Sequence, residues 1–171
     1  MEANPAALAF MAFLLLQRGG ELLLARRNTS RLLARGAVEH GAGHYPLMVA
    51  MHAAWLLAIC ALGWSNPVSA GWLAAFVLLQ LLRVWVLATL GERWTTRIIV
   101  LDAPLVAKGP YRFMAHPNYA VVVAEIVVAP MVLGLWQVAL VFTVLNAAML
   151  RVRIGTEAQA LRAASQQRQL D

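Results

Sequence analysis

The sequence predicts an all-α integral membrane protein with five transmembrane helices, and three observations support this class. Hydrophobic residues make up 61% of the 171 residues, and charged residues make up only 13%, well below the share in a soluble domain. The apolar residues gather in runs long enough to cross a bilayer as helices. The net charge of +6 comes from basic residues between these runs, as expected for loops beside an anionic membrane surface. Composition therefore favours a membrane protein over a nucleic-acid-binding one, and the length favours a single domain over residues 1–171.

The first three spans follow directly from the apolar runs at residues 5–25, 45–63 and 68–90. The first run is not expected to be a secretory signal, because no positive charge precedes it. Residues 116–151 are harder to interpret. One helix over this region would be about 50 Å long, far more than a bilayer needs, whereas two spans of about 17 residues would turn at Gly134.

Charge placement decides between these alternatives. Basic residues lie at the end of the first apolar run and after it, and they follow the third and last runs, whereas the segment 64–70 and the turn at Gly134 carry no charge. Only an odd number of spans, with the amino terminus outside, places every basic group on the cytoplasmic side. The sequence therefore predicts five spans with the carboxyl terminus inside, spans four and five as a helical hairpin, and a short cytoplasmic C-terminal helix. The basic residues are Arg18, Arg26, Arg27, Arg31, Arg35, Arg93, Arg97, Lys108, Arg112, Arg151, Arg153, Arg162 and Arg168.

Tryptophan placement agrees with this topology. Trp64, Trp72 and Trp136 all fall at predicted outer ends, where an interfacial aromatic belt is expected.

Three ionisable residues inside the predicted spans mark a candidate polar pocket. His52, Arg83 and Glu125 each lie eight or nine residues from the cytoplasmic edge of their span, about 12 Å deep at the rise of an α-helix. An ion pair between Arg83 and Glu125 is the simplest way for both charges to be tolerated there, and Gln80 and Asn146 are placed to join it. Three roles remain open to Arg83: snorkelling to the surface, a structural pair, or contact with a substrate. His52 is either a core histidine or part of the pocket.

The most irregular stretch is "GPYRFMAHPNY", residues 109–119, which ends the loop between spans three and four. Pro110 and Pro117 disfavour a helix before them, and irregular backbone at a membrane surface is tolerated where it is buried or lines a polar cavity. The residues alone leave two interpretations, an interfacial turn with aromatic anchors or part of a functional site. No metal site is predicted, since no His, Asp and Glu set has convincing ligand spacing, and Cys60 is a lone cysteine.

Three segments resemble the isoprenylcysteine carboxyl methyltransferase (ICMT) family of integral membrane enzymes: "LGERWTTRIIV", "KGPYRFMAHPNY" and "RVRIGTEAQAL". The earlier stretch "ARRNTSRLLARGAVEHGAGHYPLMV" resembles the short bacterial branch, whose members are similar to O-methyltransferases of long-chain alkylpyrones or alkylresorcinols. The resemblance covers residues 18–161. Membrane sterol reductases share a related C-terminal arrangement, so a reductase using NADPH is one alternative. A non-enzymatic transporter or assembly module is another.

The resemblance implies methyl transfer from S-adenosylmethionine in a cytoplasm-facing pocket formed by residues 91–165. Arginine suits the carboxylate of this cofactor, glutamate suits its ribose diol, and tyrosine suits its adenine or sulfonium. The family often has two consecutive acids in the tail, whereas here Ala158 follows Glu157, so only Glu157 can serve. Carried over by position, the expected cofactor-binding residues are Gly109, Pro110, Tyr111, Arg112, His116, Pro117, Tyr119, Arg153 and Glu157.

The expected acceptor is a lipophilic small molecule within the membrane lipid. It carries either an alkylpyrone- or alkylresorcinol-like hydroxyl or a prenylcysteine-like carboxylate, and a small lipid is favoured over a prenylated protein. Three catalytic residues are expected. Arg83 would orient an anionic acceptor, and Glu125, its partner, or His52 would accept a proton. The expected location is the bacterial inner membrane with the site facing the cytoplasm. The oligomeric state and the exact acceptor do not follow from the sequence.

Overall fold

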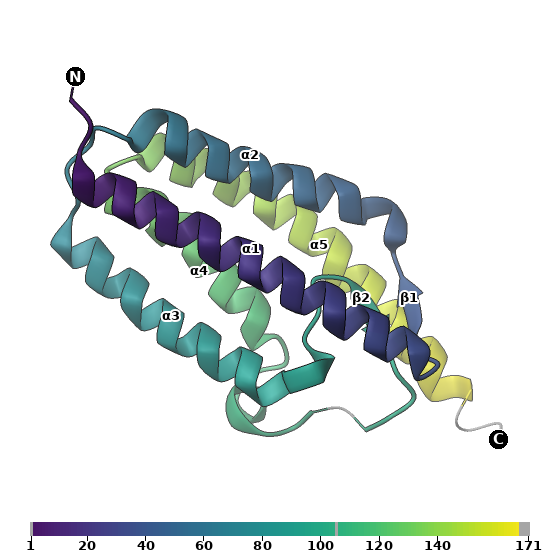
Figure 1. The fold of residues 1–171 in the computed structure, drawn as a ribbon. Coiled ribbons are helices and arrows are strands. Elements are labelled where there is room, and N and C mark those ends of the chain that lie inside the picture. The colour runs from purple at the N-terminus through teal and green to yellow at the C-terminus, as the bar shows by residue number, and fades with distance from the viewer. Residues whose placement is uncertain (1, 105, 168–171) are drawn as a thin grey trace.

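Five long helices alternate in direction along one bundle in the computed structural model, which describes residues 2–104 and 106–167 (Figure 1). One end of the bundle, the turn end, carries the connections 64–69 and 133–135. The opposite end, the ribbon end, carries the longer connections and the end of the last helix. The expected basic residue Arg168 lies outside the described residues. The helices are α1 (Pro5–Ala34), α2 (Tyr45–Gly63), α3 (Ala70–Leu90), α4 (Pro117–Val132) and α5 (Trp136–Gln167).

Within the described ranges, four helices are long and apolar enough to cross a membrane: α1, α2, α3 and α5. Helix α4 is apolar but has only 16 residues. The helical membrane class is thus confirmed. The turn between α4 and α5 also falls where the sequence predicts it, since Gly134 adopts a φ of +68° that favours glycine. The number of spans and their orientation stay predictions.

Asparagine side chains tie the connections of the turn end together. The Asn4 carboxamide oxygen accepts hydrogen bonds from backbone amides in the first turn of α1, as an N-cap does. Its amide nitrogen donates to the Asn66 carbonyl at 3.0 Å. The Asn66 amide in turn donates to the Leu133 carbonyl at 2.9 Å. The start of α1, the α2–α3 loop and the α4–α5 turn therefore form one hydrogen-bonded cap.

The closely packed core lies toward the turn end. Trp55 and Ile59 of α2 and Leu14 of α1 are all at most 1% exposed, and Phe10 packs edge-on against Phe76 of α3 with ring centroids 5.2 Å apart. The other buried members of this core include Ala7, Met11, Met51, Ile126, Ala129, Val132, Leu133, Leu135, Val138, Phe142 and Met149.

A short β-ribbon at the ribbon end departs from the predicted all-α class. Strand β1 (Val38–His40) pairs antiparallel with β2 (Ile98–Val100), with Glu39 opposite Ile99. Arg97, the residue before β2, donates to Glu39 of β1 at 2.7 Å, and its guanidinium lies 4.3 Å from the centre of the Tyr45 ring. Three-residue strands are too short to produce a readable alternation in the sequence, which is why the ribbon was missed.

Two helices are longer than the sequence analysis expected. Helix α1 continues to Ala34, nine residues past the predicted span, and α5 continues without a break to Gln167. The prediction of a separate C-terminal helix is therefore wrong, although the tail is helical. The reason is that residues 156–167 are mostly strong helix formers, and the single Gly155 before them does not end a helix.

Candidate functional site

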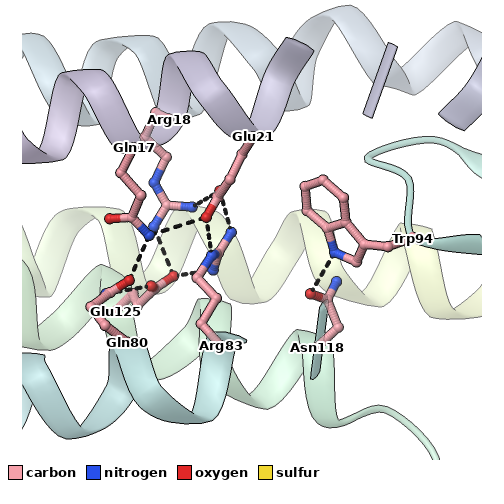
Figure 2. A network of polar contacts seen from close by, with 8 residues as sticks. All are labelled: Gln17, Arg18, Glu21, Gln80, Arg83, Trp94, Asn118 and Glu125. Carbon is pink, nitrogen blue, oxygen red and sulfur yellow. Dashed lines mark hydrogen bonds and ion pairs between the residues drawn. The ribbon is translucent and has the colours of Figure 1, made fainter. Parts of the chain in front are cut away.

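An ionic cluster of four residues, two of them buried and two partly buried, lies in the middle of the bundle. It consists of Arg18 and Glu21 from α1, Arg83 from α3 and Glu125 from α4 (Figure 2). Each arginine contacts both glutamates, so the four side chains form a closed ring of ion pairs. The ring joins three helices and has no net charge.

The individual contacts show how completely the carboxylates are occupied. Arg83 binds Glu21 through Nε and Nη2, the latter at 2.6 Å, and binds Glu125 through Nη1. Arg18 donates to Glu21 at 2.9 Å and to Glu125 at 2.8 Å. Gln80 donates to the second oxygen of Glu125 at 2.9 Å. Glu125 thus accepts from three side chains at once.

The cluster confirms the expected ion pair between Arg83 and Glu125 and excludes a snorkelling Arg83. Both residues are buried, with exposed fractions of 4% and 1%. Burying an ion costs several kcal/mol, and removing one partner of a buried pair costs roughly 3–5 kcal/mol because the other charge stays uncompensated. The closed ring with equal charges is the arrangement that makes this burial tolerable.

The α1 half of the cluster was missed by the sequence analysis. The sequence places Arg18 at the cytoplasmic end of the first span, because the first apolar run becomes polar at Gln17. Since α1 continues to Ala34, these residues instead lie inside the bundle. A signal was available: Glu21 lies four residues after Gln17 and three after Arg18, spacings that allow it to contact both on a helix. Gln17 in turn donates to Gln80 at 2.5 Å.

A cavity of about 200 Å³ lies between the ionic cluster and the ribbon end. Its walls come from all five helices and from the segment 94–96. The apolar lining residues include Leu22, Met48, Val49, Leu56, Val122 and Met149, and the polar ones include Arg18, Glu21, His52, Arg83, Asn118, Tyr119, Asn146 and Arg153. A mostly apolar cavity with a few convergent polar groups is typical of a site for a small lipophilic ligand.

His52 lies in the wall of this cavity but not in the ionic cluster. Its Nδ1 lies 2.9 Å from the carbonyl oxygen of Met48. Asn146, which is 5% exposed, also lines the cavity, and none of the described hydrogen bonds joins it to the cluster. Of the two residues expected to extend the Arg83–Glu125 pair, Gln80 therefore does so and Asn146 does not.

Four of the residues assigned to the cofactor gather at the ribbon end of α4 and α5; we call them the mouth cluster: His116, Tyr119, Arg153 and Glu157. Tyr119 donates its hydroxyl to Glu157 at 2.5 Å, and the rings of His116 and Tyr119 stack with centroids 5.2 Å apart. The Arg153 guanidinium lies 5.6 Å from the centre of the Tyr119 ring. Tyr119 and Arg153 also line the cavity, so the mouth cluster is its border toward the ribbon end.

Arg153 is held in place from outside the mouth cluster as well. It donates to the Thr96 carbonyl at 3.0 Å and to the Met48 sulfur. Its Nε is buried and has no hydrogen-bond partner in the described part of the chain. One buried donor of this arginine is therefore left for a ligand.

The turn Gly109–Arg112 packs against α3. Gly109 has a φ of +57°, and a Cβ at this position would lie 2.5 Å from the Thr89 hydroxyl. Only glycine fits here, and the buried Pro110 that follows fixes the turn.

The remaining assigned residues differ in their surroundings. Burial and the nearby Glu157 carboxylate raise the pKa of Tyr111 to about 12, so its phenol stays protonated next to the mouth cluster. Pro117 is buried at the first position of α4, where its missing N–H removes no helical hydrogen bond. Arg112 is exposed, and none of the described hydrogen bonds or ion pairs connects it to the other assigned residues.

Fold and site together define a helical membrane protein with a mostly apolar cavity that a few polar side chains line. The sequence model of the isoprenylcysteine carboxyl methyltransferase (ICMT) family matches residues 72–163, from α3 to near the end of α5. The chain belongs to this family of membrane methyltransferases. The uncharacterized protein YpbQ of Bacillus subtilis (strain 168) is 40% identical over 157 residues, which cover 88% of this chain and 94% of YpbQ. No solved structure matches the chain significantly.

Proposed function

We propose that the protein is an S-adenosylmethionine-dependent O-methyltransferase that acts on a lipophilic acceptor at the cytoplasmic face of the membrane. The observation that carries this proposal is the continuity of the site. Tyr119 and Arg153 belong both to the mouth cluster and to the cavity wall, so a cofactor at the mouth and an acceptor in the cavity would meet there. Membership of a methyltransferase family supports the reaction type.

The residues of the mouth cluster fit S-adenosylmethionine. The unpartnered Nε of Arg153 is a donor for its carboxylate, and the half-exposed Glu157 has one carboxylate oxygen left to accept from the ribose diol. The stacked rings of His116 and Tyr119 offer an aromatic face to adenine or to the sulfonium. When bound, the cofactor supplies the methyl group, which moves to the acceptor oxygen as its bond to sulfur breaks and the electron pair stays on sulfur.

The volume of the cavity limits the size of the reacting group of the acceptor. At about 200 Å³ it is somewhat larger than the roughly 150 Å³ cavity that holds a benzene ring in an engineered protein. A single substituted ring therefore fits, with an alkyl chain directed toward the lipid. This size supports a small lipid, such as an alkylpyrone or alkylresorcinol, over a bulky prenylated protein. The apolar walls also exclude water, which would otherwise compete for the methyl group.

Surface charge supports a cytoplasmic ribbon end. Exposed basic side chains gather there, whereas three of the four exposed tryptophans among the described residues, Trp64, Trp72 and Trp136, lie at the turn end. Positive charge on the cytoplasmic side and an aromatic belt at the interface are the usual pattern of inner-membrane proteins. The cofactor is made in the cytosol, so the mouth cluster would face its source. The exposed basic residues include Arg26, Arg27, Arg31, Arg35, Arg93, Lys108, Arg112 and Arg151.

The proposal is tested by cofactor binding to the purified protein in micelles. We expect S-adenosylmethionine to bind at micromolar levels, and Glu157→Gln to weaken binding about tenfold or more, since it replaces a charged acceptor by a neutral amide. Glu92→Gln, a change at an exposed carboxylate on the same end of the bundle, is the matched control and leaves the affinity unchanged. Binding of NADPH in place of S-adenosylmethionine would favour a reductase.

A second measurement identifies the acceptor class. Membranes containing the protein are supplied with S-adenosylmethionine that carries a labelled methyl group. Label in extractable lipid supports the small-lipid acceptor, and base-labile label on protein supports a prenylcysteine carboxylate. Cofactor binding without any transfer of label would contradict the methyltransferase proposal.

A further inference from the structure

We infer that His52 is the proton acceptor in methyl transfer and that the acceptor group is a hydroxyl that enters the cavity protonated. This inference rests on the proposed function and deepens it, since it separates a hydroxyl from a carboxylate and assigns the base to one residue. His52 lies on α2, outside the residues 72–163 that match the family. The assignment follows from the hydrogen bond of His52, from its place in the cavity and from the contacts of the other candidate bases.

The hydrogen bond at Nδ1 fixes the tautomer of His52. Its partner is the backbone carbonyl oxygen of Met48 at 2.9 Å, and a carbonyl oxygen can only accept. Nδ1 must therefore carry the hydrogen. A neutral imidazole carries one, so Nε2 presents a lone pair. None of the described residues hydrogen-bonds to Nε2, and His52 lines the cavity. The structure thus supplies an oriented imidazole with a free acceptor nitrogen.

The carboxylates beside the cavity are not available as bases. Both Glu21 and Glu125 bind the two arginines of the ionic cluster, and Glu125 accepts from Gln80 as well. A proton on either carboxylate would leave buried guanidinium charge uncompensated, which is strongly unfavourable. On the sequence alone, Glu125 and His52 remain alternatives for this role. The contacts make Glu125 the ion-pair partner of Arg83. His52 is therefore the residue that accepts the proton.

The other titratable groups that face the cavity do not compete with His52. They are the guanidinium groups of Arg18, Arg83 and Arg153, which have no lone pair to offer, and the phenols of Tyr45 and Tyr119. The Tyr45 hydroxyl already pairs with Thr96 at 3.0 Å, and the Tyr119 hydroxyl pairs with Glu157. Among the described cavity-lining residues, His52 is the neutral nitrogen base.

The proton balance favours a hydroxyl acceptor over a carboxylate. The acceptor oxygen gives its proton to Nε2 as it forms the bond to the methyl carbon, and the electron pair of the broken bond stays on sulfur. The positive charge lost at sulfur reappears on the imidazolium, so the total charge of the site does not change. A protonated hydroxyl also enters an apolar cavity at lower desolvation cost than an ionised carboxylate. A carboxylate needs no base, which would leave the free Nε2 without a role.

Two substitutions distinguish the roles of the two ring nitrogens of His52. His52→Asn places an amide nitrogen near the position of Nδ1 and can keep the bond to Met48, whereas it removes Nε2. His52→Gln instead places an amide group near the position of Nε2. The amide nitrogen has no basic lone pair. The matched control is His40→Gln, a histidine of β1 that lies outside the cavity.

The acceptors form a matched pair with equal chains: a long-chain alkylphenol, protonated at neutral pH, and its ring-fluorinated analogue, ionised at the same pH. For the alkylphenol we expect both His52 variants to lower turnover by about 100-fold or more, the usual contribution of a positioned base. For the ionised analogue we expect a loss of no more than about threefold, because no proton has to be removed. S-adenosylmethionine affinity should stay unchanged in both variants, and His40→Gln should transfer like the wild type.

A readout independent of turnover is the nitrogen NMR of ¹⁵N-histidine-labelled protein in micelles, with the His52 signals assigned from the variants. We expect Nδ1 to be protonated and Nε2 not. Equal losses on both acceptors, no loss on the alkylphenol, or a protonated Nε2 would each overturn the inference while leaving the methyltransferase proposal intact. Absence of cofactor binding by the wild type would instead overturn the proposed function itself.

Discussion

The turn-end half and the ribbon-end half of the bundle use opposite means to hold the same helices together. At the turn end, buried apolar side chains such as Leu14, Ile59 and Ala129 pack against one another, and asparagine caps join the connections. Toward the ribbon end, the ionic cluster and the β-ribbon join the elements, and the helices surround the cavity.

The turn-end half mainly stabilises the bundle, whereas the ribbon-end half carries the candidate site. A ligand-binding site needs an unfilled space and polar groups without hydrogen-bond partners. Each of these two features is unfavourable for the stability of a helix bundle in a membrane. The closely packed turn end compensates for this, so the other half can keep a cavity and an unpaired Nε2 on His52. The two halves meet at the ionic cluster, which belongs to both. Substitutions in each half should therefore have separable effects.

The largest effect is expected at the junction, from Glu125→Ala. It removes one of the two carboxylate partners of Arg18 and Arg83 and leaves Glu21 alone to balance two guanidinium charges, which should lower the free energy of unfolding by about 4 kcal/mol. Reversible unfolding in mixed micelles measures this, and methyl transfer should be lost as well. Glu92→Gln breaks only exposed pairs with Arg31 and Arg35 and should change stability by less than about 1 kcal/mol. Equal losses for the two variants would contradict a structural role of the cluster.

A smaller effect is expected from Leu14→Ala in the packed core of the turn end. The change leaves a cavity and should cost about 2 kcal/mol, near the low end for core leucines, because helices in lipid are held by packing without a hydrophobic term between them. Leu16→Ala is the control, since Leu16 on the same helix is 77% exposed and faces the lipid. S-adenosylmethionine affinity, measured at a temperature where the variant is folded, should not change. A loss of affinity would show that the two halves are coupled.

The smallest effect is expected from Asn4→Ala at the cap of α1. The variant loses the N-cap and the bond to the Asn66 carbonyl, worth about 1–2 kcal/mol together. Asn4→Asp keeps the capping oxygen but cannot donate to Asn66, so it should recover part of the loss. If the aspartate variant were as unstable as the alanine variant, the link to Asn66 would account for the whole effect.

The sequence predicted the helical membrane class, the turn at Gly134 and the Arg83–Glu125 pair. These features depend on local patterns: runs of apolar residues, a glycine between two runs, and charges at matched depth on separate helices. The ends of α1 and α5 were not predicted, because the parts of these helices beyond the apolar runs have no apolar pattern. The β-ribbon was not predicted, because three-residue strands are too short to show an alternation of apolar and polar residues.

What the sequence by itself determined is therefore the set of helices and the depth of the polar residues along each of them. The tertiary structure decided which of these residues meet. Arg18 and Glu21 join the ionic cluster because α1 passes beside α3 and α4, and His52 stays apart because α2 turns it toward the cavity and the Met48 carbonyl. Rotation of a helix about its axis is set by packing with its neighbours, and a one-dimensional pattern of apolar residues in a membrane carries little information about it.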